Sequence, residues 1–129
     1  MEWLVLIGRI LFSLIFILSG LNHLMKLDQM SQYAAANGVP AATLATIVTG
    51  VMILLGGLSV LLGYKSKIGA WLLVIFLIPT AFMMHKFWGL DNAMESANQM
   101  SHFMKNLSMA GAALLIYYFG SGPKSLEKE

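Results

Sequence analysis

The stretch AATLATIVTGVMILLGGLSVLLG, residues 41–63, decides the fold. It contains no charged side chain, and the uncharged run around it extends from Gln29 to Tyr64. A helix needs roughly 20 apolar residues to cross the hydrocarbon core of a bilayer. The stretch therefore predicts a membrane-spanning helix rather than the core of a soluble domain.

The rest of the chain repeats this pattern. It is 58% hydrophobic and 11% charged, with a mean hydropathy of +0.75. Further uncharged runs cover residues 10–25, 68–84 and 106–123. We therefore predict an all-α polytopic membrane protein whose residues 1–129 form one domain, a four-transmembrane-helix bundle. The predicted spans are about residues 3–25, 41–63, 68–87 and 101–120, with a short interfacial helix within residues 30–36 and a polar, mobile C-terminal tail.

The basic residues indicate orientation rather than nucleic-acid binding, because they are scattered at helix ends and the net charge is only +2. The two ends of the bundle carry Arg9, Lys65, Lys67, Lys124 and Lys128 against Lys26, Lys86 and Lys105. By the positive-inside rule, we expect both termini in the cytoplasm, N-in and C-in. The absence of cysteine excludes thiolate nucleophiles, Cys-ligated zinc and iron–sulfur clusters.

Two short stretches hold most of the side chains that can carry chemistry. His85-Lys86-Phe87-Trp88 is followed by a polar loop with Gln99, and then by His102-Phe103-Met104-Lys105-Asn106. His23, which ends the first predicted helix, falls at the same outward end of the bundle. These residues either meet the lipid headgroups as an interfacial belt or form one polar site. Because ionisable residues at membrane depth are costly, we predict a site.

Three ligand classes stay open for this site. A metal ion would use His23, His85 and His102, although the nearby lysines oppose a cation. Haem would need two of these histidines as axial ligands. The third class is a quinone or a small anion such as an oxyanion of sulfur. A quinone fits best, since its oxygens take hydrogen bonds and protons from His and Lys, and since aromatic side chains stack on its ring. We therefore predict a quinone and assign no metal-ligating residue.

In this hypothesis, His85 and His102 donate protons to the quinone oxygens, and Lys105 stabilises negative charge that develops there. The chain has no electron carrier of its own. A redox cycle would therefore need a bound cofactor or an oxidoreductase partner subunit. The other residues expected to bind the ligand are His23, Trp88, Phe103 and Asn106.

Arg9 lies about two turns inside the first predicted helix. Such a guanidinium either snorkels to the headgroups or finds a buried partner. Snorkelling is the simpler account, because the second helix offers no carboxylate to pair with it.

Taken together, these pieces resemble the DoxX-like family of small four-helix membrane proteins, over about Ile7 to Ile116. The resemblance rests on the order and spacing of Gly8-Arg9-Ile10, Phe16-Ile17-Leu18-Ser19-Gly20-Leu21-Asn22-His23, Gly38-Val39-Pro40, Gly56-Gly57, His85-Lys86-Phe87-Trp88 and His102-Phe103-Met104-Lys105-Asn106-Leu107. The positions that match the family's polar residues are Arg9, His23, His85, Trp88, His102, Lys105 and Asn106. The resemblance thereby adds Arg9 to the expected binding residues.

The resemblance implies a bacterial inner-membrane protein, since family members include a subunit of a thiosulfate:quinone oxidoreductase and proteins tied to quinone stress. Distant eukaryotic relatives are similar to assembly chaperones, so the alternative function is a non-enzymatic membrane subunit or assembly factor. Homo-oligomerisation is compatible with either of these functions. One departure is that Met52-Ile53-Leu54-Leu55 stands where many members have a Glu, which places an Arg–Glu pair in doubt.

Overall fold

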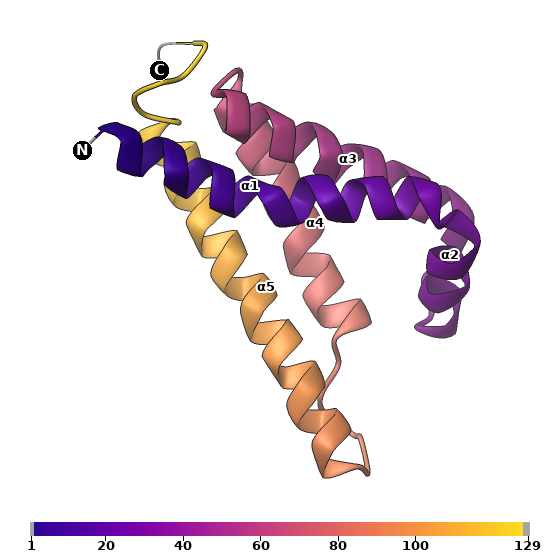
Figure 1. The fold of residues 1–129 in the computed structure, drawn as a ribbon. Coiled ribbons are helices and arrows are strands. Elements are labelled where there is room, and N and C mark those ends of the chain that lie inside the picture. Colours follow the sequence, from indigo (N-terminus) through magenta and orange to yellow (C-terminus); the bar gives the residue numbers. More distant parts are fainter. Residues whose placement is uncertain (1, 128–129) are drawn as a thin grey trace.

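The computed structural model describes residues 2–127, which form an all-α fold. Its described helices follow one another with short connections (Figure 1). In chain order they are α1 (Glu2–Met25), α2 (Leu27–Ala36), α3 (Ala42–Leu62), α4 (Ser66–Met84) and α5 (Ala93–Phe119).

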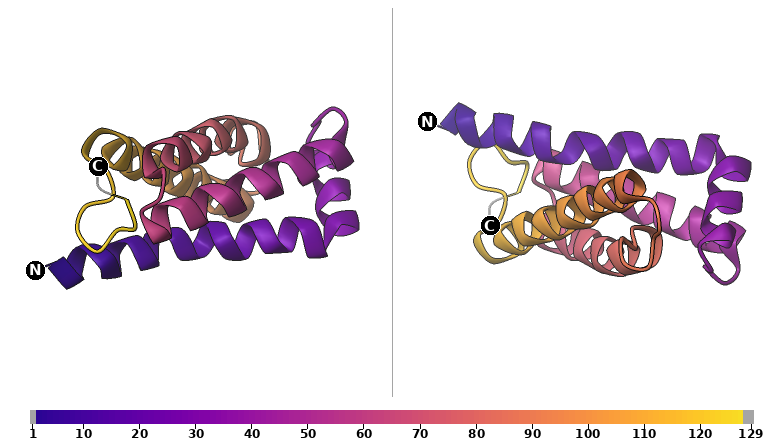
Figure 2. Two further views of the ribbon diagram at one scale, coloured as in Figure 1. Left: turned by 90° about the horizontal axis from the view of Figure 1, so that it is seen from above. Right: turned by 90° about the horizontal axis from the view of Figure 1, so that it is seen from below.

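The helices α1 and α3 lie side by side and run in opposite directions, with α2 joining them at one end (Figures 1 and 2). Glycines let their backbones approach closely. A Cβ atom added at Gly20 would lie 2.8 Å from Leu54 Cβ, and one at Gly50 would lie 2.6 Å from His23 Cβ. The small residues of these helices thus allow close helix packing.

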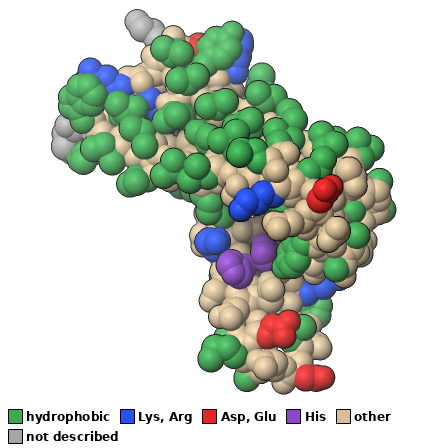
Figure 3. All heavy atoms as spheres, turned by 45° about the vertical axis from the view of Figure 1, so that its right-hand side comes forward, with side chains coloured by type: hydrophobic (Ala, Val, Ile, Leu, Met, Phe, Trp, Pro, Cys, Tyr) green, Lys and Arg blue, Asp and Glu red, His purple; other side chains and the backbone are tan. Residues whose placement is uncertain are grey.

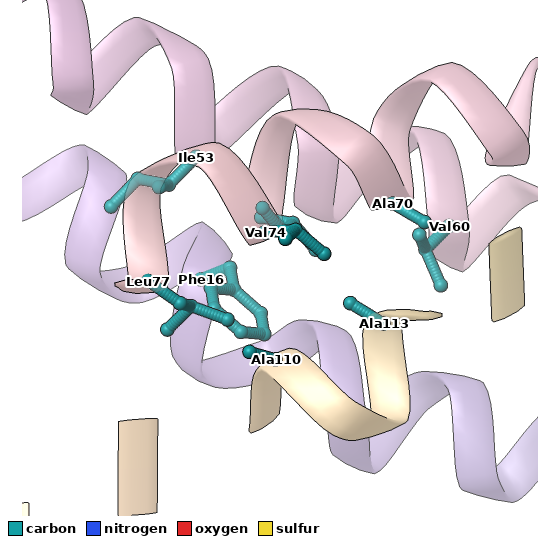
Figure 4. Close-up of a cluster of buried hydrophobic side chains, with 9 residues drawn as sticks. Phe16, Ile53, Val60, Ala70, Val74, Leu77, Ala110 and Ala113 are labelled. Carbon is teal, nitrogen blue, oxygen red and sulfur yellow. The ribbon is translucent and has the colours of Figure 1, made fainter. Parts of the chain in front are cut away.

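The helices α4 and α5 form a second pair, and α3 connects it to the first. At the α3–α4 contact, a Cβ atom at Gly56 would lie 2.9 Å from Leu73 Cδ2. Where the two pairs meet, apolar side chains from α1, α3, α4 and α5 form the hydrophobic core (Figure 4). Its buried members are Phe16, Ile53, Val60, Ala70, Leu73, Val74, Leu77, Ala110 and Ala113.

The two helix pairs meet near the chain ends and diverge away from them (Figure 1). One arm ends at α2, and the other ends at the connection between α4 and α5. This divergence leaves an angle between the arms, and the candidate site described below lies in that angle.

Three helices, α1, α3 and α4, are long and apolar enough to cross a membrane. Their outward surfaces suit lipid contact, since Leu11, Leu14 and Leu18 on α1 are 68%, 49% and 52% exposed. The helix α5 is not among the three, because its N-terminal part is polar. Length and composition therefore support three of the four membrane spans predicted from the sequence.

The expected bounds of the first two long helices agree with α1 and α3 to within one or two residues, and the interfacial helix appears as α2. The predicted start of the last helix at Ser101 is wrong, because α5 begins at Ala93. Asn92 caps it, with its side-chain oxygen accepting a hydrogen bond from the Glu95 backbone N–H at 3.0 Å. Most of the predicted polar loop is therefore helix, and α4 also ends at Met84 rather than at residue 87.

The prediction of a mobile C-terminal tail is also wrong for its described part. The backbone N–H groups of Leu126 and Glu127 donate to the carbonyls of Leu62 and Gly63 at 2.9 and 3.0 Å. These bonds satisfy carbonyls at the C-terminal end of α3 that have no helical donor. The tail therefore packs back onto the bundle beside α1.

Candidate functional site

His85 and His102 meet across the gap between α4 and α5. Their imidazole rings are stacked, with centroids 5.1 Å apart and planes 25° from parallel. His85 follows the last residue of α4, and its Nδ1 lies 3.0 Å from Oε1 of Gln99, one turn before His102 in α5. The structure thus brings together the two polar stretches that the sequence singled out.

These histidines border a pocket of about 580 Å³, within the range of small-molecule sites. Side chains from all five helices line it. We call it the central pocket. Figure 3 shows histidine and basic side chains gathered at the waist between the two arms of the molecule. Its polar lining comprises Ser19, His23, Tyr33, Thr46, Thr49, Thr80, His85, His102, Lys105 and Asn106, and its other walls are mainly apolar.

Five of the residues predicted for the site therefore line one pocket. His23 comes from the end of α1, His85 from the end of α4, and His102, Lys105 and Asn106 from one face of α5. None of the lining residues is acidic. The pocket therefore presents a basic, hydrogen-bonding rim against an apolar wall.

His23 is fixed in orientation by its own helix. Its Nδ1 lies 2.7 Å from the carbonyl oxygen of Ser19, and its ring meets the Phe76 ring edge to face at 6.1 Å. Its Cβ packs on the backbone of Gly50 in α3, where no side chain would fit. The ring position is thus set by one hydrogen bond and two packing contacts.

Asn106 is only 5% exposed although it borders the pocket. Its side-chain amide has two N–H donors and one carbonyl acceptor with which it can bond a ligand in the pocket. Asn106 is therefore a candidate for direct ligand contact.

The electrostatics of the pocket keep His85 neutral. Burial lowers the pKa of His85, the hydrogen bond that it donates to Gln99 raises it, and the nearby charges of His102 and Lys105 lower it further. The net direction is downward, so His85 is uncharged at neutral pH. A neutral imidazole beside a lysine ammonium can exchange a proton with a ligand at low cost.

Trp88 and Phe103 do not line the pocket. They belong to an aromatic cluster with Phe82 and Phe87, in which the Trp88 and Phe103 ring centroids are 6.0 Å apart and the Phe82 and Phe103 centroids 5.1 Å apart. This cluster packs the α4–α5 connection onto α5. The structure therefore brings Trp88 and Phe103 close to the site without placing them at its surface.

Arg9 lies away from the pocket, near the chain ends, and is 4% exposed. Its Nη1 donates to the carbonyls of Ser121 and Pro123 at 2.8 and 2.7 Å and to Ser125 Oγ at 2.8 Å, and its Nη2 donates to the carbonyl of Lys124. Arg9 thus binds the C-terminal tail. The expectation that it snorkels to the headgroups is wrong, and the structure does not bring it to the other site residues.

The histidines are not arranged as a three-ligand metal site. Across residues 2–127, no three His, Asp or Glu side chains are grouped closely enough to hold a metal ion. His85 and His102 are paired face to face, whereas His23 is paired with Phe76. The three-histidine arrangement left open by the sequence is therefore not formed.

The pocket wall contributed by α2, α3 and the middle of α4 was not predicted from the sequence. Tyr33, Thr46, Thr49 and Phe76 line the pocket there. A signal was present, because Thr46 and Thr49 are spaced by three in an otherwise apolar helix and so share one face with Gly50.

Comparison with known proteins gives concordant matches. A family model described as DoxX matches residues 4–86, which include His23 and His85 but end before α5. The inner membrane protein YphA of Escherichia coli (strain K12) is 36% identical over 125 residues, covering 97% of this chain and 89% of YphA. The inner membrane protein YqjF of the same organism is 32% identical over 124 residues, covering 96% and 89%. No solved structure matches significantly.

Proposed function

Because this chain belongs to the DoxX family and is a multi-pass protein of the inner membrane, we propose that it binds a quinone or quinol in the central pocket. The observation that carries this proposal is the convergence of His23, His85, His102, Lys105 and Asn106 on one largely apolar pocket of about 580 Å³. A quinone ring needs such an apolar wall, and its two oxygens need a few polar groups.

The access route supports a lipid-soluble ligand. Ile15 on α1 and Ile75 on α4 both line the pocket and are 41% and 45% exposed. In a bilayer, side chains that line a pocket and also face outward are in contact with lipid. A quinone dissolved in the hydrocarbon core can therefore enter sideways between the two arms.

The chemistry of the rim suits proton exchange at quinone oxygens. His85 and His102 are imidazoles that can exchange a proton with a ligand oxygen, and Lys105 supplies a positive charge for an oxyanion. No described residue is an electron carrier, so a redox reaction would need a bound cofactor or a partner subunit. We therefore propose a quinone-linked oxidoreductase or a subunit of one.

We also propose that α5 is a fourth span and that both chain ends are cytoplasmic. Its 27 residues correspond to about 40 Å of helix, which is long enough to cross a bilayer. The described basic residues near the chain ends are Arg9, Lys65, Lys67 and Lys124, against Lys26, Lys86 and Lys105 at the pocket end; Lys128 lies outside the described residues. In this orientation the pocket opens near the outer face.

The alternative is a non-enzymatic subunit or assembly factor, which would need a free helix face for its partner. The glycines of α3 are already occupied, since Gly50, Gly56 and Gly57 each contact α1 or α4. Gly111 on α5 is open, because a Cβ atom added there would meet nothing within 4 Å. A face around Gly111 is therefore the place where a partner helix or a second copy would pack.

The test is to purify the protein from membranes in mild detergent, extract bound lipids with organic solvent and identify quinones by chromatography and mass spectrometry. We expect about one quinone per protein, and its loss in the His85→Ala/His102→Ala double variant. Met104→Leu is the matched control, because Met104 is exposed on α5 and does not line the pocket. A ligand-free protein that co-purifies with a stoichiometric partner supports the alternative, and a Soret band indicates haem instead.

A further inference from the structure

Four polar side chains on one wall of the central pocket are hydrogen-bond acceptors towards it, because their own hydrogens are already used inside the protein. His23 shows this most directly. Its Nδ1 lies 2.7 Å from the Ser19 carbonyl oxygen, which can only accept a hydrogen bond. Nδ1 therefore carries the ring hydrogen, and Nε2 of the neutral ring is left with a lone pair.

The ring nitrogens of His85 have the same donor and acceptor roles as those of His23. Its Nδ1 lies 3.0 Å from Oε1 of Gln99, an oxygen that accepts. Nδ1 is again the donor, and Nε2 is again the acceptor. His23 and His85, at the ends of different helices, thus each offer a ligand an Nε2 atom without a hydrogen.

Two threonine hydroxyls follow the same rule. Thr46 Oγ1 donates to the carbonyl of Ala42 at 2.8 Å, and Thr49 Oγ1 donates to that of Ala45 at 2.7 Å. Each hydroxyl has one hydrogen, so each oxygen offers the pocket only lone pairs. The wall built by α1, α3 and the end of α4 therefore accepts hydrogen bonds at four side chains.

Clear donors lie opposite, on α5. Lys105 has an ammonium group that can only donate, and the adjacent Asn106 has an amide NH₂ group that can donate. A ligand that satisfies both walls must donate hydrogens to one and accept from the other. A hydroxyl group does both, whereas a carbonyl oxygen only accepts.

We infer that the central pocket selects the reduced, hydroxyl-bearing form of its ligand, a quinol, over the oxidised quinone. This inference rests on the proposed function. The quinol hydroxyls donate to Nε2 of His23 or His85 and accept from Lys105 or Asn106. A quinone would face lone pairs at His23, which leaves acceptors of the pocket wall unpaired. The histidines therefore receive hydrogens from the ligand instead of donating them, the reverse of the polarity expected from the sequence.

The test uses a small matched pair of probes, duroquinol and duroquinone, which differ in two hydrogens and share one ring. Isothermal titration calorimetry on the detergent-solubilised full-length protein, under anaerobic reducing or oxidising conditions, gives a dissociation constant for each. One net neutral hydrogen bond corresponds to roughly a fivefold change, so we expect duroquinol to bind at least about fivefold more tightly.

Two variants separate this hydrogen-bonding cause from shape. His23→Phe keeps an aromatic ring but removes Nε2, and Thr49→Val removes a hydroxyl with little change in shape. Each should weaken duroquinol binding and leave duroquinone binding unchanged or stronger. Thr49→Val keeps the test valid if His23→Phe does not fold. Met104→Leu, outside the pocket, should change neither constant.

The outcomes are distinguishable. A duroquinol preference that shrinks in either variant supports the inference. Equal affinities, or tighter duroquinone binding, overturn it but leave a pocket that binds quinones. If neither probe binds the wild-type protein, the proposed function fails and the inference fails with it.

Discussion

The imidazole of His85, at the end of α4, stacks on that of His102 in α5, with ring centroids 5.1 Å apart. Burial lowers the pKa of His85, and the neighbouring charges of His102 and Lys105 lower it further, so the His85 ring is held neutral. The stacked pair also joins α4 and α5 at the mouth of the central pocket. It also makes the site sensitive to pH.

Stability should therefore fall as the pH drops below about 6.5, the ordinary histidine pKa. The folded state lowers the pKa of His85, so the unfolded chain binds a proton there at a higher pH than the folded chain does. Stability from this group is present above that pH and is lost as the pH falls towards the folded-state pKa. Unfolding temperatures between pH 8 and pH 5 should drop less in His85→Gln than in wild type. Parallel curves for the two proteins would contradict this assignment.

Arg9 should hold the C-terminal tail in place. Arg9→Met removes four hydrogen bonds that a buried cation donates to the tail, three of them to backbone carbonyls. We expect a loss of about 2–4 kcal/mol in the free energy of unfolding and rapid proteolysis of the tail. Arg9→Lys should rescue little, because an ammonium cannot reproduce the planar fork. The account of Arg9 is wrong if the tail of Arg9→Met stays as protease-resistant as in wild type.

Gly50 should be intolerant of any side chain, because a Cβ atom there would lie 2.6 Å from His23 Cβ. Gly50→Ala should cost about 1–3 kcal/mol by overpacking and should also displace the His23 ring, which weakens ligand binding. Gly111→Ala is the matched control, since its Cβ meets nothing within 4 Å. Thermal unfolding and the quinone content of both purified variants provide the comparison. Equal behaviour of the two would argue against the α1–α3 contact at this position.

Asn92 should be required for the first turns of α5. Its side chain accepts the Glu95 N–H at 3.0 Å, and replacing such a cap by Ala typically costs about 1 kcal/mol. We expect Asn92→Ala to raise hydrogen–deuterium exchange over residues 93–99, whereas Asn98→Ala, exposed on the same helix, should not. Exchange as fast as in a loop in the wild-type protein would restore the loop predicted from the sequence.

The sequence was sufficient where one physical signal dominates. Uncharged runs predicted the spans of α1 and α3, and the clustering of His85 with His102 predicted that these side chains share a site. It failed where a side chain's partner is distant in the chain. Nothing local to Arg9 indicates that its acceptors are carbonyls more than 110 residues away.

The start of α5 was missed for a different reason. The polar residues of this segment predicted a loop, although Asn92 followed by Glu95 is a helix N-terminal signal. The role of Thr46 and Thr49 in the pocket was not predicted because it depends on hydrogen bonds to their own helix. These bonds use the hydroxyl hydrogens and leave the oxygens as acceptors.

The most direct test of the central claim is photo-crosslinking with an azidoquinone in membranes, followed by mass spectrometry of the modified peptides. We predict adducts in the segments that line the central pocket, at His23 and within residues 46–52, 76–85 and 102–109, and their suppression by excess unlabelled quinol. Adducts spread over the outward lipid-facing residues of α1, or adducts that excess quinol does not suppress, would show that the central pocket is not a quinone site.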